Sequence, residues 1–248
     1  MSNWYDYQWD LSGQPAWFHV DLDYMEEFDH LGDFTTLLHV TCMPNKEKSN
    51  FRHSDYRQLE KVLADCCQLL GEKAVYVGSI EYPSQRRYYF YTADPRLFVP
   101  LLKYSEQNSH FQIFCDKATE LNRQTYYRLL VPDTAQRQAS NNLSYIESLA
   151  SRGDDTKAPR RVNLHFYFPT GTNREAFSTA AKEIGFAIGK GDYVPERELP
   201  YYLSIHQISP LQITELTELT TKAIRAAEEY GGILEHFDSA FVPIRHNL

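Results

Sequence analysis

Apolar and polar positions in the second half of the chain recur with the periods typical of strands and helices. Every second residue of 162–168 is apolar, which predicts a strand with one buried face. Thr172 and Glu175 have capping-box spacing and precede an apolar stripe over 176–184, which predicts a helix that ends at Gly185. The remaining predicted elements are strands at 186–188 and 200–206, a helix that starts near Ser209 and ends at Gly231, and an apolar stretch at 233–242.

The first half of the chain shows the same β-α-β-β-α-β order. Segments 74–82 and 86–93 flank Pro83, Ser84 and Gln85, which predicts a hairpin. The other predicted elements are strands at 16–22, 35–43 and 110–115, a helix at 54–70, and a helix from Asp94 to Leu102. We therefore predict an α+β fold with two ferredoxin-like (β-α-β-β-α-β) sandwiches in tandem, each an antiparallel sheet with helices on one face.

The composition changes between the two halves. Residues 134–159 are mostly small and polar, with a short amphipathic helix followed by a loop-like segment. A chain of 248 residues also favours two domains over one. We therefore expect an N-terminal α+β domain at 1–133, a linker with a short helix at 134–159, and a second domain at 160–248.

The charge of the chain limits the partners that it can bind. The whole chain has a formal net charge of −8, and residues 1–133 carry 13 basic and 19 acidic side chains. The basic doublets are Arg86-Arg87 and Arg160-Arg161, whereas a phosphate backbone needs clustered cations. We therefore expect a basic protein partner and no direct binding of nucleic acid.

Segments that would direct the chain to a membrane are not predicted. No run of apolar residues has the length of a membrane span, and the N-terminus lacks the basic and apolar pattern of a signal peptide. We expect a cytoplasmic protein with no membrane partner, and the sequence leaves the oligomeric state open.

Motifs of catalysis are not found, so we expect no enzymatic activity and no cofactor. The chain has no glycine-rich phosphate loop, GxSxG, HExxH or calcium-loop motif. His19, Asp21 and Asp23 alternate along one strand, and imidazole with carboxylates is a metal-ligand combination. This trio supports an alternative prediction of a metal-assisted hydrolase. The simpler interpretation places the three on the solvent face of a half-buried strand, and we predict no metal site.

Several polar residues in the second half are candidate functional residues. His165 shares one strand face with Asn163 and Tyr167, which suits a general acid or base, and His236 shares a face with Asp238, with the same interpretation. Arg160 and Arg161 together favour contact with an acidic group. Each set also has a structural interpretation, as an exposed sheet face or the end of a linker.

The segment at about 145–243 resembles the RraB family, bacterial protein regulators of ribonuclease E. The resemblance rests on 149–155 and 159–168, on Gly185-Phe186, on Tyr230-Gly231-Gly232 and on Phe237-Asp238. It departs from the family at Asn163-Leu164, where an Asp-His pair is expected, and at Ser239-Ala240-Phe241, which replaces a Gly-Trp pair. The resemblance implies a ferredoxin-like fold. The candidate partner contacts that follow from it and from the pattern are Arg160, Arg161, His165, Tyr230, Gly231, Gly232 and Asp238.

The segment at about 1–133 resembles a bacterial family known as domain of unknown function 695. The resemblance rests on Trp4 and Tyr7, on Pro15-Ala16 with Val20-Asp21-Leu22, on Tyr76-Val77-Gly78, and on the segments 87–92 and 126–133. It implies no activity.

From these observations we predict a non-enzymatic regulatory protein that works by protein–protein contact. The partner implied by the resemblance is an RNA-processing assembly of the ribonuclease E type, and a basic, RNA-binding segment of that partner would suit the acidic N-terminal half.

Overall fold

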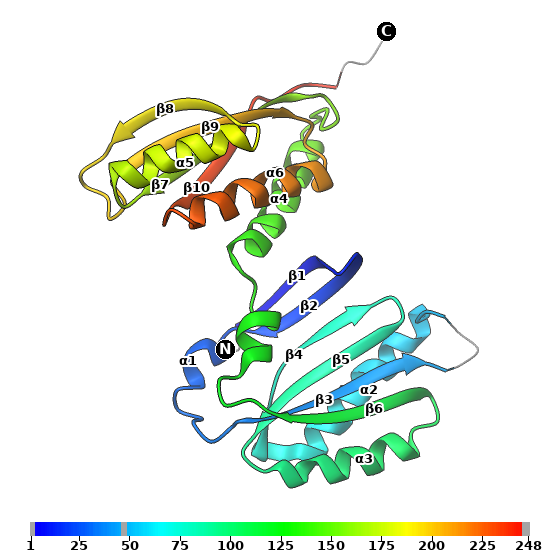
Figure 1. Ribbon diagram of the computed structural model, residues 1–248. Coiled ribbons are helices and arrows are strands. Elements are labelled where there is room, and N and C mark those ends of the chain that lie inside the picture. The colour runs from blue at the N-terminus through cyan, green and yellow to red at the C-terminus, as the bar shows by residue number, and fades with distance from the viewer. Residues whose placement is uncertain (1–2, 46–48, 245–248) are drawn as a thin grey trace. The chain divides into compact units, whose positions relative to one another are not determined.

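The computed structural model describes residues 3–45 and 49–244, in two compact units (Figure 1). The units are Met1–Pro132 and Asp133–Leu248. Both contain an antiparallel sheet with helices, so the predicted α+β class with two sheets is confirmed.

The N-terminal unit is built on a six-stranded antiparallel sheet with the order β1-β2-β4-β5-β3-β6. Its strands are β1 (Trp4–Leu11), β2 (Gln14–Asp21), β3 (Thr36–Pro44), β4 (Ala74–Tyr82), β5 (Gln85–Thr92) and β6 (Phe111–Thr119). Its helices are α1 (Tyr24–Glu27), α2 (His53–Leu70) and α3 (Phe98–Gln107), with short turns η1 (Gly71–Lys73) and η2 (Pro95–Leu97) and the π-helical turn η3 (Thr125–Leu130).

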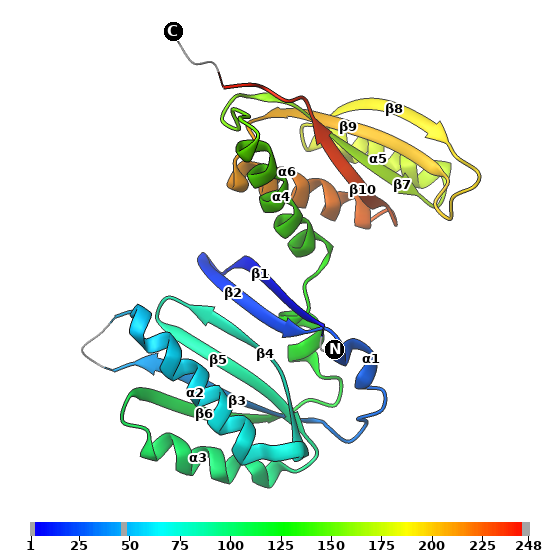
Figure 2. The same cartoon turned by 180° about the vertical axis from the view of Figure 1, so that it is seen from behind.

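The sheet of this unit has a hydrophobic core on each face. Helices α2 and α3 cover one face (Figure 2), where they pack on residues such as Leu38 and Phe90. The prediction of helices on one face describes this side. The neighbouring residues Leu37 and Tyr91 point to the opposite face, because side chains alternate along a strand, and there they pack with Phe28 and η3. The sequence pattern did not predict that Phe28 and η3 pack on the second face of the sheet.

Strand β1 was not among the predicted elements, whereas β2 corresponds to the predicted strand at 16–22. The two pair in register and are joined by Ser12 and Gly13. Both turn residues have positive φ, 57° and 83°, which is the backbone of a type I′ hairpin turn. The Ser-Gly pair was therefore an available signal for a hairpin at this position.

The C-terminal unit contains a four-stranded antiparallel sheet with the order β10-β7-β9-β8. Its elements after Pro159 follow one another as strand, helix, strand, strand, helix, strand. They are β7 (Arg160–Phe168), α5 (Gly171–Glu183), β8 (Ala187–Tyr193), β9 (Tyr201–Ser209), α6 (Ile213–Glu228) and β10 (Ile233–Ser239).

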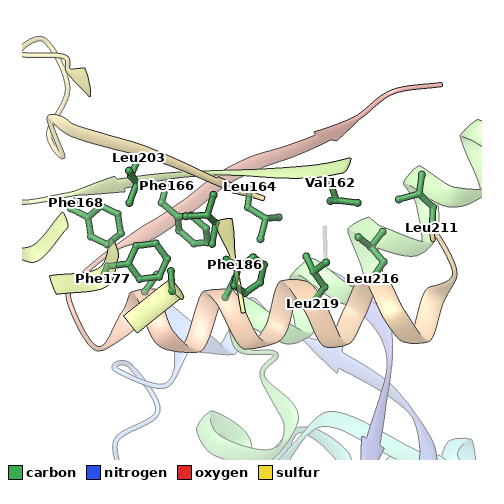
Figure 3. Packing of buried hydrophobic residues seen from close by; sticks show 14 of the residues in the cluster. Val162, Leu164, Phe166, Phe168, Phe177, Phe186, Leu203, Leu211, Leu216 and Leu219 are labelled. Atoms are coloured by element: carbon green, nitrogen blue, oxygen red, sulfur yellow. The ribbon is translucent and has the colours of Figure 1, made fainter. Parts of the chain in front are cut away.

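One face of this sheet is buried under α5 and α6 (Figure 3). Val162, Leu164, Phe166 and Phe168 of β7 all point into this core and are fully buried, as the alternating pattern predicts. The polar residues between them point to the other face of the sheet, which is not covered by these helices.

The segment predicted as a linker contains a long helix, α4 (Thr134–Ser151). Asp133 and Gln136 form a reciprocal capping box at its start. Asn142 is buried and donates a hydrogen bond to Thr220 of α6 (2.9 Å), and Leu149 belongs to the core of the C-terminal unit. This helix therefore packs as part of the C-terminal unit.

The end of α6 supplies a stability prediction. A Cβ atom at Gly232 would lie 2.1 Å from Cε1 of the fully buried Phe168 ring. We expect Gly232→Ala to lower the free energy of unfolding by about 1–3 kcal/mol, as overpacking does. Gly191→Ala is the matched control, since its Cβ would meet atoms only at 3.7 Å. Urea unfolding checks both, and equal effects of the two variants would contradict the prediction.

Candidate functional site

The polar face of the C-terminal sheet gathers the strongest candidate chemistry among the described residues. Side chains from three neighbouring strands meet on this face, opposite the core drawn in Figure 3. We define the outer face by Arg161, Asn163, His165 and Tyr167 of β7, Tyr202 and His206 of β9, and His236 and Asp238 of β10.

A β-bulge brings His236 onto the outer face. The register of β10 on β7 shifts between Leu234 and His236, so that His236 lies opposite His165. Leu234 and Phe237 both pack on the core, although they are an odd number of residues apart. A regular strand would send His236 into the core with Leu234, and the extra residue reverses this alternation.

His165 is the centre of the hydrogen-bond network on the outer face. Its Nε2 lies 2.6 Å from Oδ2 of Asp238, and its Nδ1 lies 2.7 Å from the Tyr202 hydroxyl. Asn163 donates to the other Asp238 oxygen at 2.8 Å. The His236 ring stacks on the His165 ring at 4.2 Å with an interplanar angle of 10°. Both oxygens of Asp238 and both nitrogens of His165 are therefore engaged.

The charges of this network follow from its contacts. Partial burial alone would raise the pKa of Asp238, but the hydrogen bonds from Asn163 and His165 and the nearby histidines outweigh burial and lower it. Asp238 is therefore a carboxylate at neutral pH. Burial and the nearby Arg161 guanidinium lower the pKa of His206, so this imidazole is neutral at the same pH.

Aromatic and cationic groups extend the outer face towards the start of β10. The Arg197 guanidinium lies 4.2 Å from the centre of the Tyr167 ring and pairs with Glu235. These residues line a shallow hollow together with Leu199 and Ile233. An aromatic ring, an arginine and an apolar floor are the groups that protein interfaces favour.

Arg160, a predicted partner contact, is buried instead of exposed. Only 3% of its side chain is accessible, and it pairs with Asp154 at 2.7 Å between Nη1 and Oδ2. It also donates to the backbone oxygens of Ala158 and Ala240. Its neighbour Arg161 points the other way, is exposed, and donates to Asn163 at 2.7 Å. Of the basic doublet, Arg161 alone belongs to the outer face.

Tyr230, Gly231 and Gly232 lie where α6 ends. Gly231 has a φ of 66°, and the Gly232 amide donates to Ala227, which ends the helix. Tyr230 packs on the core, and its backbone oxygen accepts a hydrogen bond from Asn173. These contacts account for the three residues structurally.

In the described part of the chain, His19, Asp21 and Asp23 do not form a metal-ligand group, although Oδ1 of Asp21 accepts a hydrogen bond from the Asp23 amide at 3.1 Å. His19 stacks on Trp4 at 4.3 Å and pairs with Asp6 at 2.6 Å. Asp21 was expected on a solvent face but is 6% exposed, and burial raises its pKa. Among the described residues, the group with metal-ligand geometry is His165, His236 and Asp238. The sequence pattern identified His165, His236 and Asp238 as candidates but did not predict that His165 lies next to the other two.

No helix in the described parts of the chain has both the length and the apolar character needed to cross a bilayer.

Comparisons with known proteins find matches to families. No curated protein matches this chain. A crystal structure of an unknown protein from Galdieria sulphuraria matches with 11% identity over 83% of this chain and 98% of that chain, with a TM-score of 0.23. The model described as "Regulator of ribonuclease activity B" (RraB) matches residues 140–239, which contain the outer face. The model of a family of unknown function (DUF695) matches residues 2–130, more than half of the chain, and the protein therefore belongs to this family, with an RraB domain after it.

Proposed function

We propose that this protein is a non-enzymatic cytoplasmic regulator of a ribonuclease of the ribonuclease E type and acts by binding it. The match of residues 140–239 to the RraB model carries this proposal. The outer face is the contact surface that we assign to the C-terminal unit, because it presents Arg161, Tyr167 and Tyr202 on a rigid sheet.

The contacts of the polar groups on this face favour binding over catalysis. His165 lies opposite Ser204 in the sheet register. A histidine beside a serine hydroxyl is the arrangement in which a base activates a nucleophile. The Ser204 hydroxyl instead accepts from the Lys190 amide at 2.8 Å. The two ring nitrogens of His165 form hydrogen bonds with Tyr202 and Asp238 and not with Ser204. The pair therefore lacks the hydrogen bond that activates a serine nucleophile.

The acidic N-terminal unit supplies the second part of the proposal. Glu26, Glu27, Asp29 and Asp33 are all exposed, and we refer to them as the acidic segment. A ribonuclease binds RNA through basic groups, so the acidic segment is complementary to such a region of the partner.

A pull-down from the native host, followed by an RNA-cleavage assay with the retained endonuclease, tests the proposal. We expect the full chain to bind the endonuclease and to slow cleavage. If the chain retains no ribonuclease and leaves the cleavage rate of a purified ribonuclease E-type enzyme unchanged, the proposal is wrong.

Variants of the outer face test which surface binds. We expect Arg161→Glu and Tyr167→Ala each to weaken binding to the endonuclease by about 10-fold or more, because arginine and tyrosine dominate interface energies. Lys182→Glu is the matched control, since Lys182 is exposed on α5, on the other side of the sheet. Titration by surface plasmon resonance measures all three. If only Lys182→Glu weakens binding, the contact surface lies on the side of the sheet covered by α5 and α6, and the assignment of the outer face is wrong.

A further inference from the structure

We propose that His165, His236 and Asp238 form a binding site for a divalent transition metal ion of the zinc type on the outer face of the C-terminal sheet. One ligand atom from each residue lies within 4.8 Å of the other two. Two imidazoles and one carboxylate leave a coordination position open for water, which is the composition of a three-ligand zinc site. This inference does not depend on the proposed function.

The separations between the ligand atoms suit a metal ion once the Asp238 and His236 side chains rotate. Rotation of His236 is needed because its ring is stacked on that of His165, and the lone pair of an imidazole nitrogen lies in the ring plane. Zinc holds nitrogen and oxygen ligands at about 2.0–2.2 Å, so two ligand atoms of a tetrahedral site lie about 3.4 Å apart. Nε2 of His165 and Oδ2 of Asp238 are 2.6 Å apart and must separate by less than 1 Å. The side chains of Asp238 and His236 are 54% and 55% accessible, so both have room to rotate.

The partner of His165 on its other nitrogen permits the tautomer that metal binding needs. In the neutral ring, with Asp238 as acceptor, Nε2 carries the proton and Nδ1 is the acceptor for the Tyr202 hydroxyl. When Nε2 binds a metal, the ring proton moves to Nδ1. The Tyr202 oxygen then accepts from it, because a hydroxyl can serve in either role. A second partner of this kind orients a ligating histidine.

The remaining groups around the site have the same supporting role. Asn163 donates to Oδ1 of Asp238 and leaves Oδ2 directed at His165. Arg161 in turn donates to the Asn163 oxygen at 2.7 Å and fixes the amide orientation. The bulge in β10 places His236 beside His165, which a regular strand would not do. The three ligands are therefore held by the sheet and not by a flexible loop.

The donor set selects among metal ions. Imidazole nitrogen favours Zn²⁺, Cu²⁺, Ni²⁺ and Co²⁺, whereas Mg²⁺ and Ca²⁺ prefer all-oxygen sites. We therefore expect the site to bind Zn²⁺ and Co²⁺ and to leave Mg²⁺ and Ca²⁺ unbound at equal concentration.

Titration of the full-length, untagged protein with Zn²⁺ and Co²⁺ tests this inference. We expect one tight site by isothermal titration calorimetry, and visible absorption bands of tetrahedral Co²⁺. His165→Ala, His236→Ala and Asp238→Asn should each weaken binding by about 100-fold or more. Tyr202→Phe should weaken it by about 10-fold, as the loss of a supporting hydrogen bond does.

Two histidine variants serve as controls. His206 lies on the same outer face, and His19 belongs to the separate trio on β2, so His206→Ala and His19→Ala should leave Zn²⁺ affinity and stoichiometry unchanged. Circular dichroism verifies that each variant is folded. No Zn²⁺ binding by the full chain, or binding that survives His236→Ala and is lost in His19→Ala, would overturn the proposal.

Discussion

Replacing Arg160 with methionine is expected to lower the free energy of unfolding of the C-terminal unit by about 3–5 kcal/mol, because it leaves the buried Asp154 carboxylate without its counter-charge. The side chains of Arg160 and Asp154 are 3% and 0% accessible. Asp154 also accepts from the Val242 amide at 2.9 Å, and Arg160 donates to the Ala240 oxygen at the same distance. The pair thus ties the segment before β7 to the segment after β10.

A second variant separates the charge from the shape of this pair. Arg160→Met together with Asp154→Leu removes both charges, so we expect it to recover part or all of the lost stability. Urea unfolding of both variants measures the difference. A loss below about 1 kcal/mol in the single variant would contradict the buried pair, since exposed ion pairs contribute no more than this.

The same pair makes stability depend on pH in the acid range. Burial alone would raise the pKa of Asp154, but hydrogen bonds from Arg160 and the Val242 amide, with the charges of Arg160 and Arg152, outweigh it and lower the pKa. A lowered pKa in the folded state stabilises the fold fully above the ordinary value of 3.8, and this contribution is lost as the pH falls through the folded-state value. We expect the double variant to lose less stability than the wild type on acidification through this range.

Arg160 and Arg161 show what a sequence pattern can and cannot decide. Both were predicted as partner contacts, as a basic doublet. The alternation that buries Val162 and Leu164 also places Arg160 on the core side and Arg161 on the outer side, so the pattern held the information. The pattern did not indicate that Asp154 pairs with Arg160, and this pairing is what makes a buried arginine stable.

The candidate site was predictable residue by residue but not as a constellation. The strand pattern placed His165 on an exposed sheet face and put His236 and Asp238 together on another. Their proximity depends on the pairing of β7 with β10 and on the bulge at Leu234–His236. The pairing of β7 with β10 cannot be read from the local sequence, because the two strands are far apart along the chain. The bulge breaks the alternation of buried and exposed residues on which strand prediction depends.

The fold was predictable where one apolar period continues through an element. The apolar stripe within 134–159 predicted a helix but did not predict that this helix packs on α6. The hydrogen bond from Asn142 to Thr220 joins residues that are far apart in the sequence. Similarly, Phe28 gave no sign that it covers the second face of the N-terminal sheet. It is held there by the aromatic cluster with Tyr91 and Tyr126 and by the Arg123 guanidinium 4.6 Å from its ring.

Reversing the four charges of the acidic segment to lysine is expected to slow association with the endonuclease by about 10-fold or more at low salt, with a smaller effect on dissociation. Exposed charges steer the encounter from a distance and contribute little once a rim contact has formed. At physiological ionic strength the effect should shrink, because screening acts over about 8 Å. Stopped-flow or surface plasmon resonance at two salt concentrations measures the two rate constants.

The local structure explains why this segment is a suitable steering surface. Arg123 donates to the backbone oxygens of Phe34 at 3.0 Å and Leu31 at 2.6 Å, so the chain between α1 and β3 is held in place. The acidic side chains of this stretch and of α1 are exposed to solvent. Reversal to lysine therefore changes the charge of the surface without removing these backbone contacts.

A matched variant isolates position from net charge. Lysine at the exposed residues Glu175, Glu183, Glu228 and Glu229 changes the net charge by the same amount on α5 and at the end of α6. If its association slows as much as that of the acidic-segment variant, the effect is one of total charge and the assignment of the acidic segment is wrong. An RNA oligomer run in parallel should show no tight binding to the wild type, because the cations that release counterions are sparse on this chain.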